Sequence, residues 1–356
     1  MEDPRSNKRN TLHHSLVEMM FLVISGVISG MNTWSDIESF GEEKLDWLRK
    51  FFPYERGIPW HGTLGRVFAR LDNQAFGQYF MEWVDSLHTM TKGEVIAVDG
   101  KRMRGSYDKS EGKAAIHMVS AYATDQQLCL GQLATEAKSN EITVIPELLE
   151  LLTLEGATVT IDAMGCQKDI SKKIVKKEAD YILGVKDNQK GLLEQIEKVF
   201  TITAISSEAT SNDIGHGRIE QRTCSVIDDL MFFDDHKDWP GLKTLVRIKA
   251  KRIDKRTGKE ENSIRYFISS KLAHAKVFNK DIRSHWAIEN KLHWVLDVNF
   301  KEDSSRKRKG NSAQNFGIIS KIALTLIDNY PAKKSKPWKR LKAAFNDEIR
   351  EDILTI

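Results

Sequence analysis

One stretch of the chain, residues 94–200, alternates between short apolar runs and amphipathic segments, and this order of elements limits the fold more than any other feature. It opens with an apolar run at 94–99 that ends in Asp-Gly, as expected of a buried strand. Two further strands are joined by a polar link of hairpin length. The pattern predicts, in order, strands at 115–123 and 128–135, a helix at 142–152, a strand at 157–161, a helix at 168–178, a strand at 181–185 and a helix at 189–200.

Three strands that can pair antiparallel are thus followed by β-α-β units, whose strands are parallel neighbours joined by right-handed crossovers. This order predicts an α/β protein with a mixed sheet, and it is the order of elements in the ribonuclease H-like fold. In that fold, carboxylates stand at the end of the first strand, just after the fourth strand and on a helix after the fifth. Asp99 and Asp162 fall at the first two of these positions.

Residues 12–88 predict helices only. The apolar segment Leu16–Ile28 is shorter than a membrane span requires and carries Glu18, so burial in a protein core is the better interpretation. Overlapping capping-box patterns predict a second, short helix that ends at Gly41. The cap of that second helix is expected at Thr33 or Ser35. One helical face should then be formed by Leu45, Leu48, Phe51 and Phe52. Two further helices are expected, one capped by Thr63 and one capped by Asp72 or Asn73.

Residues 201–270 interrupt the alternation and predict a β-rich insertion, with strand-like segments at 221–227, 244–253 and 263–270. One long helix over Val277–Val298 should then resume the core. In the tail, Ser335 and Pro337 predict the start of a basic amphipathic helix. The predicted layout is a helical N-terminal domain at 1–90, an α/β core in two parts at 91–200 and 271–330, the insertion at 201–270, and the C-terminal helix at 331–356.

Charge and cysteine content indicate the kind of partner and the compartment. The net charge of +4 is mild, but several basic clusters make a polyanion a partner to consider, although any single cluster is more often a solvated face. The three cysteines are far apart and form no CxxC pair, which argues against a zinc site and a disulfide framework and for a reducing compartment. With no signal-peptide pattern, we expect a cytoplasmic protein without a membrane partner.

Three acidic residues form the candidate catalytic site. Phosphoryl transfer on DNA uses two metal ions about 3.5–4 Å apart, and magnesium is held by a few carboxylates plus water and substrate phosphate. Taken singly, each acid has an ordinary explanation: Asp99 in a turn, Asp162 as a helix cap and Glu289 as an exposed helical residue. Together they favour a metal site, because each falls where one known fold requires an acid.

The chain also carries a specific combination of motifs, namely Asn32–Gly41, the stretch from Gly57 to Phe68, Ala97–Lys101, Ile161–Gln167, Asn188-Gln189, His216–Arg222 and His285–Asp303. In this combination, and over nearly its whole length, the chain resembles the H-repeat-associated proteins linked to Rhs elements. These are a subfamily of bacterial insertion-sequence DDE transposases.

The resemblance implies a ribonuclease H-like core in which Asp99, Asp162 and Glu289 bind Mg²⁺ or Mn²⁺. It implies hydrolysis of a phosphodiester at each element end, followed by attack of the freed 3′-hydroxyl on target DNA. Double-stranded DNA is then the partner, and a homodimer is expected because two ends must be cut in concert. Two alternatives stay open: an inactive or domesticated DNA-binding relic, and a ribonuclease H-like nuclease that does not transpose.

The chain departs from the pattern of related transposases around the third acid. They place an Arg four positions before it and a Lys seven after it, where this chain has His285 and Leu296. Phosphate contacts near the scissile bond must therefore differ, with Arg283 and Lys291 as candidates beside His285. Other candidates for contacts with DNA are Lys101, Arg102 and Arg104 after the first acid, and Arg218 and Arg222 in the insertion.

Overall fold

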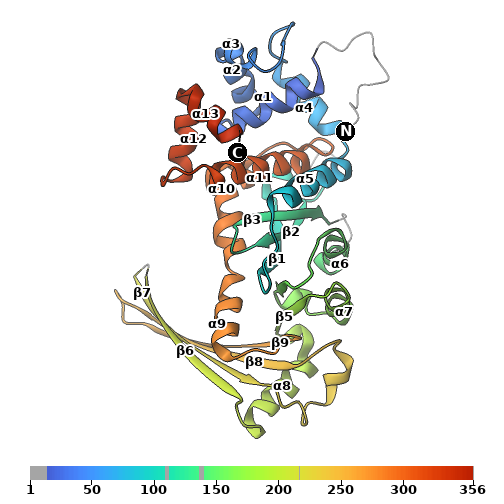
Figure 1. Ribbon diagram of the computed structural model, residues 1–356, viewed down its shortest axis with the longest axis vertical. Coiled ribbons are helices and arrows are strands. Elements are labelled where there is room, and N and C mark those ends of the chain that lie inside the picture. Colours follow the sequence, from blue (N-terminus) through green and yellow to red (C-terminus); the bar gives the residue numbers. More distant parts are fainter. Residues whose placement is uncertain (1–13, 109–111, 136–139, 216, 356) are drawn as a thin grey trace. The chain divides into compact units, whose positions relative to one another are not determined.

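The structure is a computed structural model that describes residues 14–108, 112–135, 140–215 and 217–355 (Figure 1). The chain divides into two compact units. The helical unit comprises residues 1–87, 101–118 and 291–356, and the sheet unit comprises residues 88–100 and 119–290. The predicted α/β class is confirmed in its coarse form, because the chain combines one large mixed sheet with many helices.

The sheet has nine strands in the order β3-β2-β1-β4-β5-β9-β8-β7-β6. Their bounds are β1 Val95–Arg102, β2 His117–Ala123, β3 Leu128–Ala134, β4 Thr158–Ile161, β5 Asp180–Val185, β6 Ser207–Gly215, β7 Arg218–Ile227, β8 Thr244–Asp254 and β9 Glu260–Ser269. β1, β4 and β5 are parallel neighbours, as the β-α-β pattern predicts.

The predicted β-rich insertion extends this same sheet. β9 pairs antiparallel with β5, with Val185 opposite Tyr266, and β6 to β9 then form an antiparallel meander. β6 is absent from the sequence prediction because its residues, Ser207–Gly215, are mostly polar and show no apolar alternation. Pairing with β7, rather than an apolar face, therefore makes this segment a strand.

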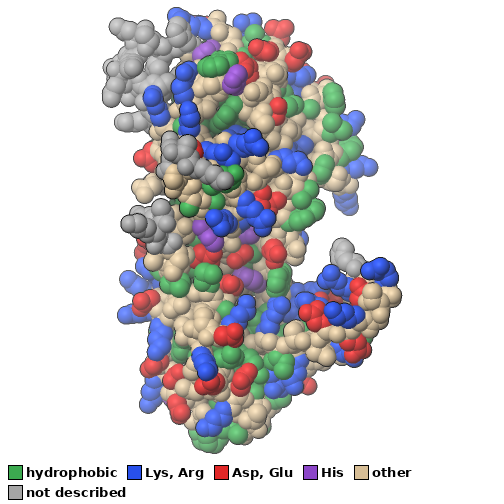
Figure 2. Space-filling model, turned by 180° about the vertical axis from the view of Figure 1, so that it is seen from behind, with side chains coloured by type: hydrophobic (Ala, Val, Ile, Leu, Met, Phe, Trp, Pro, Cys, Tyr) green, Lys and Arg blue, Asp and Glu red, His purple; other side chains and the backbone are tan. Residues whose placement is uncertain are grey.

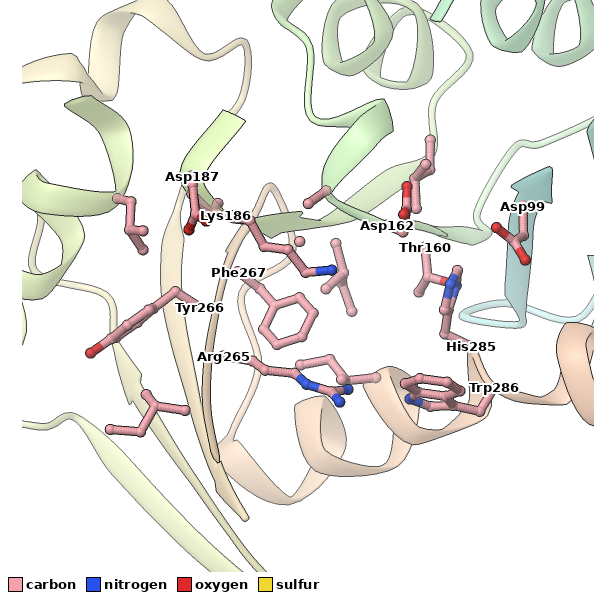
Figure 3. A pocket seen from close by; sticks show the side chains of 18 of the residues that line it. Asp99, Thr160, Asp162, Lys186, Asp187, Arg265, Tyr266, Phe267, His285 and Trp286 are labelled. Carbon is pink, nitrogen blue, oxygen red and sulfur yellow. The ribbon is translucent and has the colours of Figure 1, made fainter. Parts of the chain in front are cut away.

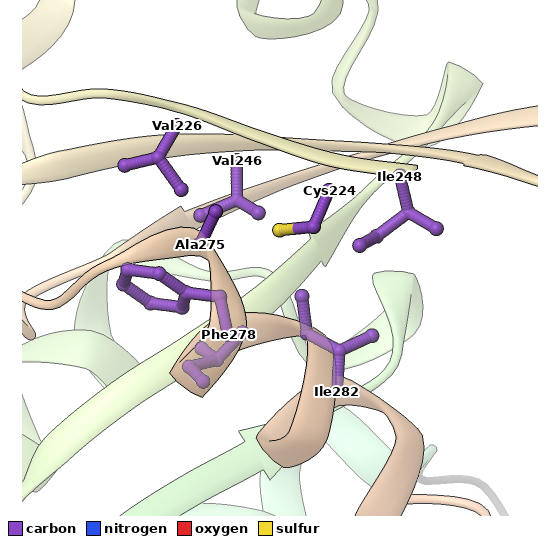
Figure 4. Packing of buried hydrophobic residues seen from close by; sticks show 8 residues of the cluster. Cys224, Val226, Val246, Ile248, Ala275, Phe278 and Ile282 are labelled. Carbon is purple, nitrogen blue, oxygen red and sulfur yellow. The ribbon is translucent and has the colours of Figure 1, made fainter. Parts of the chain in front are cut away.

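Helices cover both faces of the meander. On one face, α9 (Ala275–Ser284) packs Ala275, Phe278 and Ile282 against buried side chains of the strands (Figure 4). On the opposite face lies α8 (Lys190–Ile202), whose Phe200 ring contacts Tyr266 and lies under the Arg247 guanidinium. The remaining elements of the sheet unit are α6 Glu141–Leu151, α7 Lys168–Lys176 and the short 3₁₀ turns η3 Ala163–Gly165, η4 Asp187–Gln189 and η5 Asp234–Asp238.

The helical unit is built around α11 (Ser312–Asn329), which is buried along most of its length. Helices α1 Leu16–Ile28, α4 His61–Arg70, α5 Asn73–Leu87, α12 Lys336–Phe345 and α13 Asp347–Leu354 pack against it. The other elements of this unit are α2 Trp34–Glu43, α3 Leu45–Leu48, α10 Trp294–Asn299 and the 3₁₀ turns η2 Arg104–Ser106 and η7 Glu302–Ser304. Neither α11 nor α13 is among the helices predicted from the sequence. Among the described residues, no helix is both long and apolar enough to cross a membrane.

Several local predictions in the helical unit are confirmed. The first helix has the predicted bounds, Leu16–Ile28, and buries much of its surface. Thr33 caps α2 in a capping box with Asp36, so that of the two overlapping patterns the first is used. The Asp72 carboxylate accepts the N–H groups of Gln74 and Ala75 at the start of α5. Ser335 caps α12 as predicted.

Other local predictions are wrong. Gly41 does not end α2, which continues to Glu43. A Cβ atom there would lie 2.8 Å from Ile58 and Leu22 side-chain atoms, so this glycine serves close packing rather than termination. α4 begins at His61 without a side-chain cap, so Thr63 lies inside it. The face predicted from Leu45 to Phe52 is also shortened, because α3 spans only four residues.

The long helix predicted over Val277–Val298 is three segments. α9 ends at Ser284, the π-helical turn η6 covers Ile288–His293, and α10 follows from Trp294. An apolar spacing of three and four does not distinguish an α-helix from one interrupted by a wider turn. π-Helical turns are rare in proteins, but those that do occur are often at functional sites. This one contains Glu289.

Candidate active site

Two of the three predicted acids occupy equivalent positions on adjacent parallel strands. In the β1–β4 pair, Val98 lies opposite Ile161. The residue that follows each of them in the sequence is an aspartate: Asp99, within β1, and Asp162, directly after β4. β1 continues past Asp99 to Arg102, so the strand does not end at this acid as the sequence predicted. Because residues that lie opposite each other on neighbouring strands point to the same face of the sheet, this register still places the two carboxyl groups close together.

Asp162 also has a local structural role. Its Oδ1 accepts the backbone N–H of Met164 at 3.0 Å and so caps the turn η3. The sequence alternative of a helix-capping aspartate is therefore also true, and it leaves the second carboxylate oxygen for another partner. The cap fixes the orientation of the side chain with respect to β4.

Glu289, the third acid, is exposed and lines one cavity of about 660 Å³ together with the two aspartates. Figure 3 labels Asp99 and Asp162 in this cavity. One turn before Glu289, a hydrogen bond of 3.0 Å joins the Nδ1 atom of His285 and the Oγ1 atom of Thr160. Burial lowers the pKa of His285, although the charge of Asp162 acts in the opposite direction. The imidazole is thus neutral near pH 7 and supplies a hydrogen bond rather than the positive charge of an arginine.

The electrostatics of Asp99 reveal a fourth acid near the site. Burial, together with the negative charges of Asp162, Glu141 and Glu289, raises the pKa of Asp99 to about 7. Glu141 is the first residue of α6 and is buried. The sequence analysis missed it because the first turn of a helix is an ordinary place for a glutamate. Only the fold shows that this helix begins near Asp99.

This donor set fits a hard divalent cation. Carboxylate oxygens are the protein ligands preferred by Mg²⁺ and Mn²⁺, and a bound positive charge would offset the burial and negative charge that raise the pKa of Asp99. Within the described residues, no three acidic, histidine or cysteine side chains converge on a single point. Binding therefore requires some rotation of side chains, which the exposed Glu289 is free to make.

A second charged cluster lies in the helical unit and includes Lys101. Its ammonium group donates to the carboxylates of Asp297 and Glu302, and Glu302 is buried. The chain here is tightly packed, since a Cβ atom on Gly105 would lie 2.2 Å from the carbonyl oxygen of Ser305. Lys101 is therefore already engaged by two acids and is poorly placed to bind a phosphate.

The other basic candidates are distributed differently. Arg283 forms an ion pair with Asp213, Arg222 is buried on β7, and Arg104 lies 3.5 Å from Asp303 with an exposed side chain. Arg102, Arg218 and Lys291 are exposed. Figure 2 shows Lys and Arg side chains gathered with acidic ones on the arm formed by the long strands β6 to β9. His216, the first residue of the motif that contains Arg218 and Arg222, lies outside the described residues.

Two family models match the chain. One, described as DDE_Tnp_1-associated, matches residues 1–84, and one, described as Transposase DDE domain, matches residues 90–326. The chain belongs to the DDE transposase family. It is accordingly a metal-dependent polynucleotidyl transferase, and the function expected from the sequence resemblance, an insertion-sequence transposase, is confirmed.

Relatives place the chain more narrowly. It is 45% identical to "Putative transposase YncI" of Escherichia coli O157:H7, over 99% of this chain and 92% of the relative. It is 41% identical to "H repeat-associated putative transposase YhhI" of Escherichia coli K12, over 94% of this chain and 91% of the relative. A piggyBac transposase synaptic complex with hairpin DNA aligns with 95% of this chain and 72% of its own, at 10% identity and a TM-score of 0.47, which is too low to establish a shared fold.

Proposed function

We propose that Asp99, Asp162 and Glu289 hold the Mg²⁺ or Mn²⁺ ions with which this transposase cuts the ends of its element and joins them to target DNA. The observation that carries the proposal is the register of β1 and β4, in which Asp99 and Asp162 directly follow the paired residues Val98 and Ile161. Glu289 lines the same cavity as both aspartates. The carboxylate of Glu141 adds negative charge near Asp99, and the bound ions would offset this charge.

The fold behind this site is, in our proposal, a ribonuclease H-like core. Support comes from the parallel neighbours β1, β4 and β5, which follow the predicted order of elements. We keep the predicted domain layout, with a helical domain at 1–90, core parts at 91–200 and 271–330, an insertion at 201–270 and a C-terminal helix at 331–356. The match of the associated family model to residues 1–84 supports its first boundary.

In this mechanism Asp99, Asp162 and Glu289 would hold the ions, which would supply activation of the attacking oxygen and stabilisation of the leaving oxygen in an in-line displacement. The chain itself orients the ligands. Asp162 is held by its hydrogen bond to Met164, and His285 is held beside it by Thr160. Neutral His285 can donate one hydrogen bond to a phosphate oxygen, which is how we expect it to replace the arginine of related enzymes.

We propose double-stranded DNA, as element ends and as target, as the substrate. Its phosphates would be contacted by Arg102, Arg104, Arg218, Arg222, Arg283 and Lys291. Arg283 would exchange its exposed ion pair with Asp213 for a phosphate, which is a small loss because exposed ion pairs contribute little. Lys101 stands apart, and because Asp297 and Glu302 engage its ammonium, we propose a structural role for it.

The test is cleavage of duplexes taken from the sequence that flanks the gene on both sides. Wild-type protein should cut at the element ends with Mg²⁺ or Mn²⁺ and not in excess chelator. Asp99→Asn and Asp162→Asn should each abolish cleavage, because each removes a metal-binding charge at nearly constant volume, while DNA binding falls little because it rests mainly on basic residues.

Two outcomes would contradict the proposal. Robust cutting in chelator would exclude metal-dependent catalysis by these residues. Wild-type turnover by either aspartate variant at millimolar Mg²⁺ would remove that residue from the metal site. Lys249→Gln is a suitable control variant, because this exposed lysine on β8 does not line the cavity.

A further inference from the structure

The cavity lined by the three acids is also lined by two basic side chains and an aromatic one. Lys186, directly after β5, and Arg265, on β9, line it together with Trp286, which lies two residues after the end of α9. Figure 3 shows the Lys186 amino group pointing into the cavity and the Arg265 guanidinium beside the Trp286 indole. The guanidinium carbon of Arg265 lies 5.2 Å from the centre of that ring. The sequence analysis singled out neither of these two cations.

Both cations are available to a ligand. Among the described residues, no carboxylate forms an ion pair with Lys186 or Arg265. The aromatic face beside Arg265 limits its rotamers without neutralising its charge, so less side-chain entropy is lost when an anion binds. Such a fixed planar fork matches the geometry of a phosphate.

The surroundings of Arg265 carry further positive charge. Arg222 is buried nearby on β7, and within the described part of the chain its Nε has no hydrogen-bond partner. Burial lowers the pKa of Arg222, and the positive charge of Arg265 acts in the same direction. The negative charge of Glu220 acts in the opposite direction, and Glu220 itself is paired with Arg252.

The size and position of the cavity limit what the anion can be. At about 660 Å³ the cavity is of small-molecule dimensions, so a whole duplex, whose major groove alone is about 12 Å wide, cannot enter it. Asp187 and Glu197 also line the cavity and would repel an anion that was not held by the cations. These limits are satisfied by one backbone phosphate of a single DNA strand, if the same strand also passes the three acids.

We propose that Lys186 and Arg265 form a phosphate subsite for the strand being cut, holding a backbone phosphate next to the scissile one, with Trp286 orienting the guanidinium. This inference rests on the proposed function, since it presupposes that DNA is cut at Asp99, Asp162 and Glu289. It adds a second point of attachment, which fixes the direction in which the strand runs through the site.

The experiment pairs protein variants with single neutral phosphates. Methylphosphonates are placed one at a time within three nucleotides of the cut in a duplex carrying an element end, and affinity is measured with Mg²⁺ in an Asp162→Asn background, which should bind without cutting. We expect one position to weaken binding roughly tenfold, as for loss of a charge-assisted hydrogen bond. Arg265→Gln and Lys186→Gln should weaken the unmodified duplex similarly and should then be insensitive to that methylphosphonate.

Controls separate this coupling from a general loss of charge. Arg265→Lys should restore part of the affinity, and Lys249→Gln, which removes an exposed lysine outside the cavity, should keep the full methylphosphonate effect. Each cavity variant should also reduce the slope of log affinity against log salt by about one, as for one lost phosphate contact.

The inference and the proposed function fail in different ways. Suppose that wild-type protein cuts element ends, but each methylphosphonate weakens DNA binding equally in the wild-type protein, Arg265→Gln and Lys186→Gln. The phosphate subsite would then be wrong, and the proposed metal site would be unaffected. If wild-type protein cuts no end with any divalent ion, the proposed function has failed first. Coupling at a position on the uncut strand would also overturn the assignment.

Discussion

At the proposed metal site, the ionisation of Asp99 would be coupled to metal binding. Burial and the neighbouring acids, Asp162 foremost, raise its pKa to about 7. Below that pH the carboxyl group is protonated in the metal-free protein, and a divalent ion must displace the proton. Above it the carboxylate is already free to bind.

We therefore predict that Mn²⁺ binding weakens as pH falls from 8 to 6, by up to about tenfold for the pH unit below 7. Titration of the metal-free protein with Mn²⁺, with free Mn²⁺ followed by electron paramagnetic resonance, measures this directly. Asp99→Asn should bind more weakly and lose most of the pH dependence. An affinity of the wild-type protein that is constant between pH 6 and 8 would contradict the prediction.

Glu289 and Asp297 are separated by eight residues, and their environments differ. Glu289 is exposed and lines the cavity, whereas the carboxylate of Asp297 accepts a hydrogen bond from Lys101. We predict that Glu289→Gln eliminates strand cleavage, while Asp297→Asn leaves measurable metal-dependent activity with a modest loss of stability. Cleavage assays at saturating Mg²⁺ decide this, and the reverse pattern would make Asp297 the third ligand.

At the scale of elements, α9 connects the meander to the segment that carries Glu289. Its attachment depends on Phe278, which is fully buried in the cluster with Cys224, Val226 and Ile248 (Figure 4). The neighbouring Val277 is 39% exposed and so offers a matched position on the same helix.

Phe278→Ala should lower the free energy of unfolding by about 3–5 kcal/mol, because it removes a large buried side chain and leaves a cavity. Val277→Ala should change it by no more than about 0.5 kcal/mol, as is usual for an exposed position. Urea denaturation followed by circular dichroism compares the two. Similar losses for both variants would mean that the packing of α9 does not stabilise this face of the sheet.

At the scale of the whole molecule, the expected reaction needs two element ends to be cut together, and we keep the prediction of a homodimer on DNA. Each protomer has a mass of 40.6 kDa. Analytical ultracentrifugation of the Asp162→Asn variant with end duplexes should show complexes that contain two protomers and two duplexes. Duplexes with scrambled ends are the control, and complexes with one protomer per duplex at all concentrations would refute the prediction.

The amino-acid sequence by itself determined the features that depend on neighbours along the chain. Apolar runs and polar links placed most strands and helices of residues 94–200, and side-chain caps placed the starts of α2, α5 and α12. The order of strand and helix types also placed Asp99 and Asp162 on strands expected to be neighbours, although β1 continues past Asp99 to Arg102. These features follow from backbone hydrogen bonding and side-chain spacing, which act over a few residues.

Tertiary structure alone decided which distant segments meet. It paired β9 with β5, so that the insertion extends the sheet, and it made a strand of the polar segment Ser207–Gly215. It brought Glu141 near Asp99, and it engaged Lys101 with Asp297, 196 residues further along the chain. Such contacts depend on strand register and on the packing of whole elements, and a single sequence carries no local signal for either.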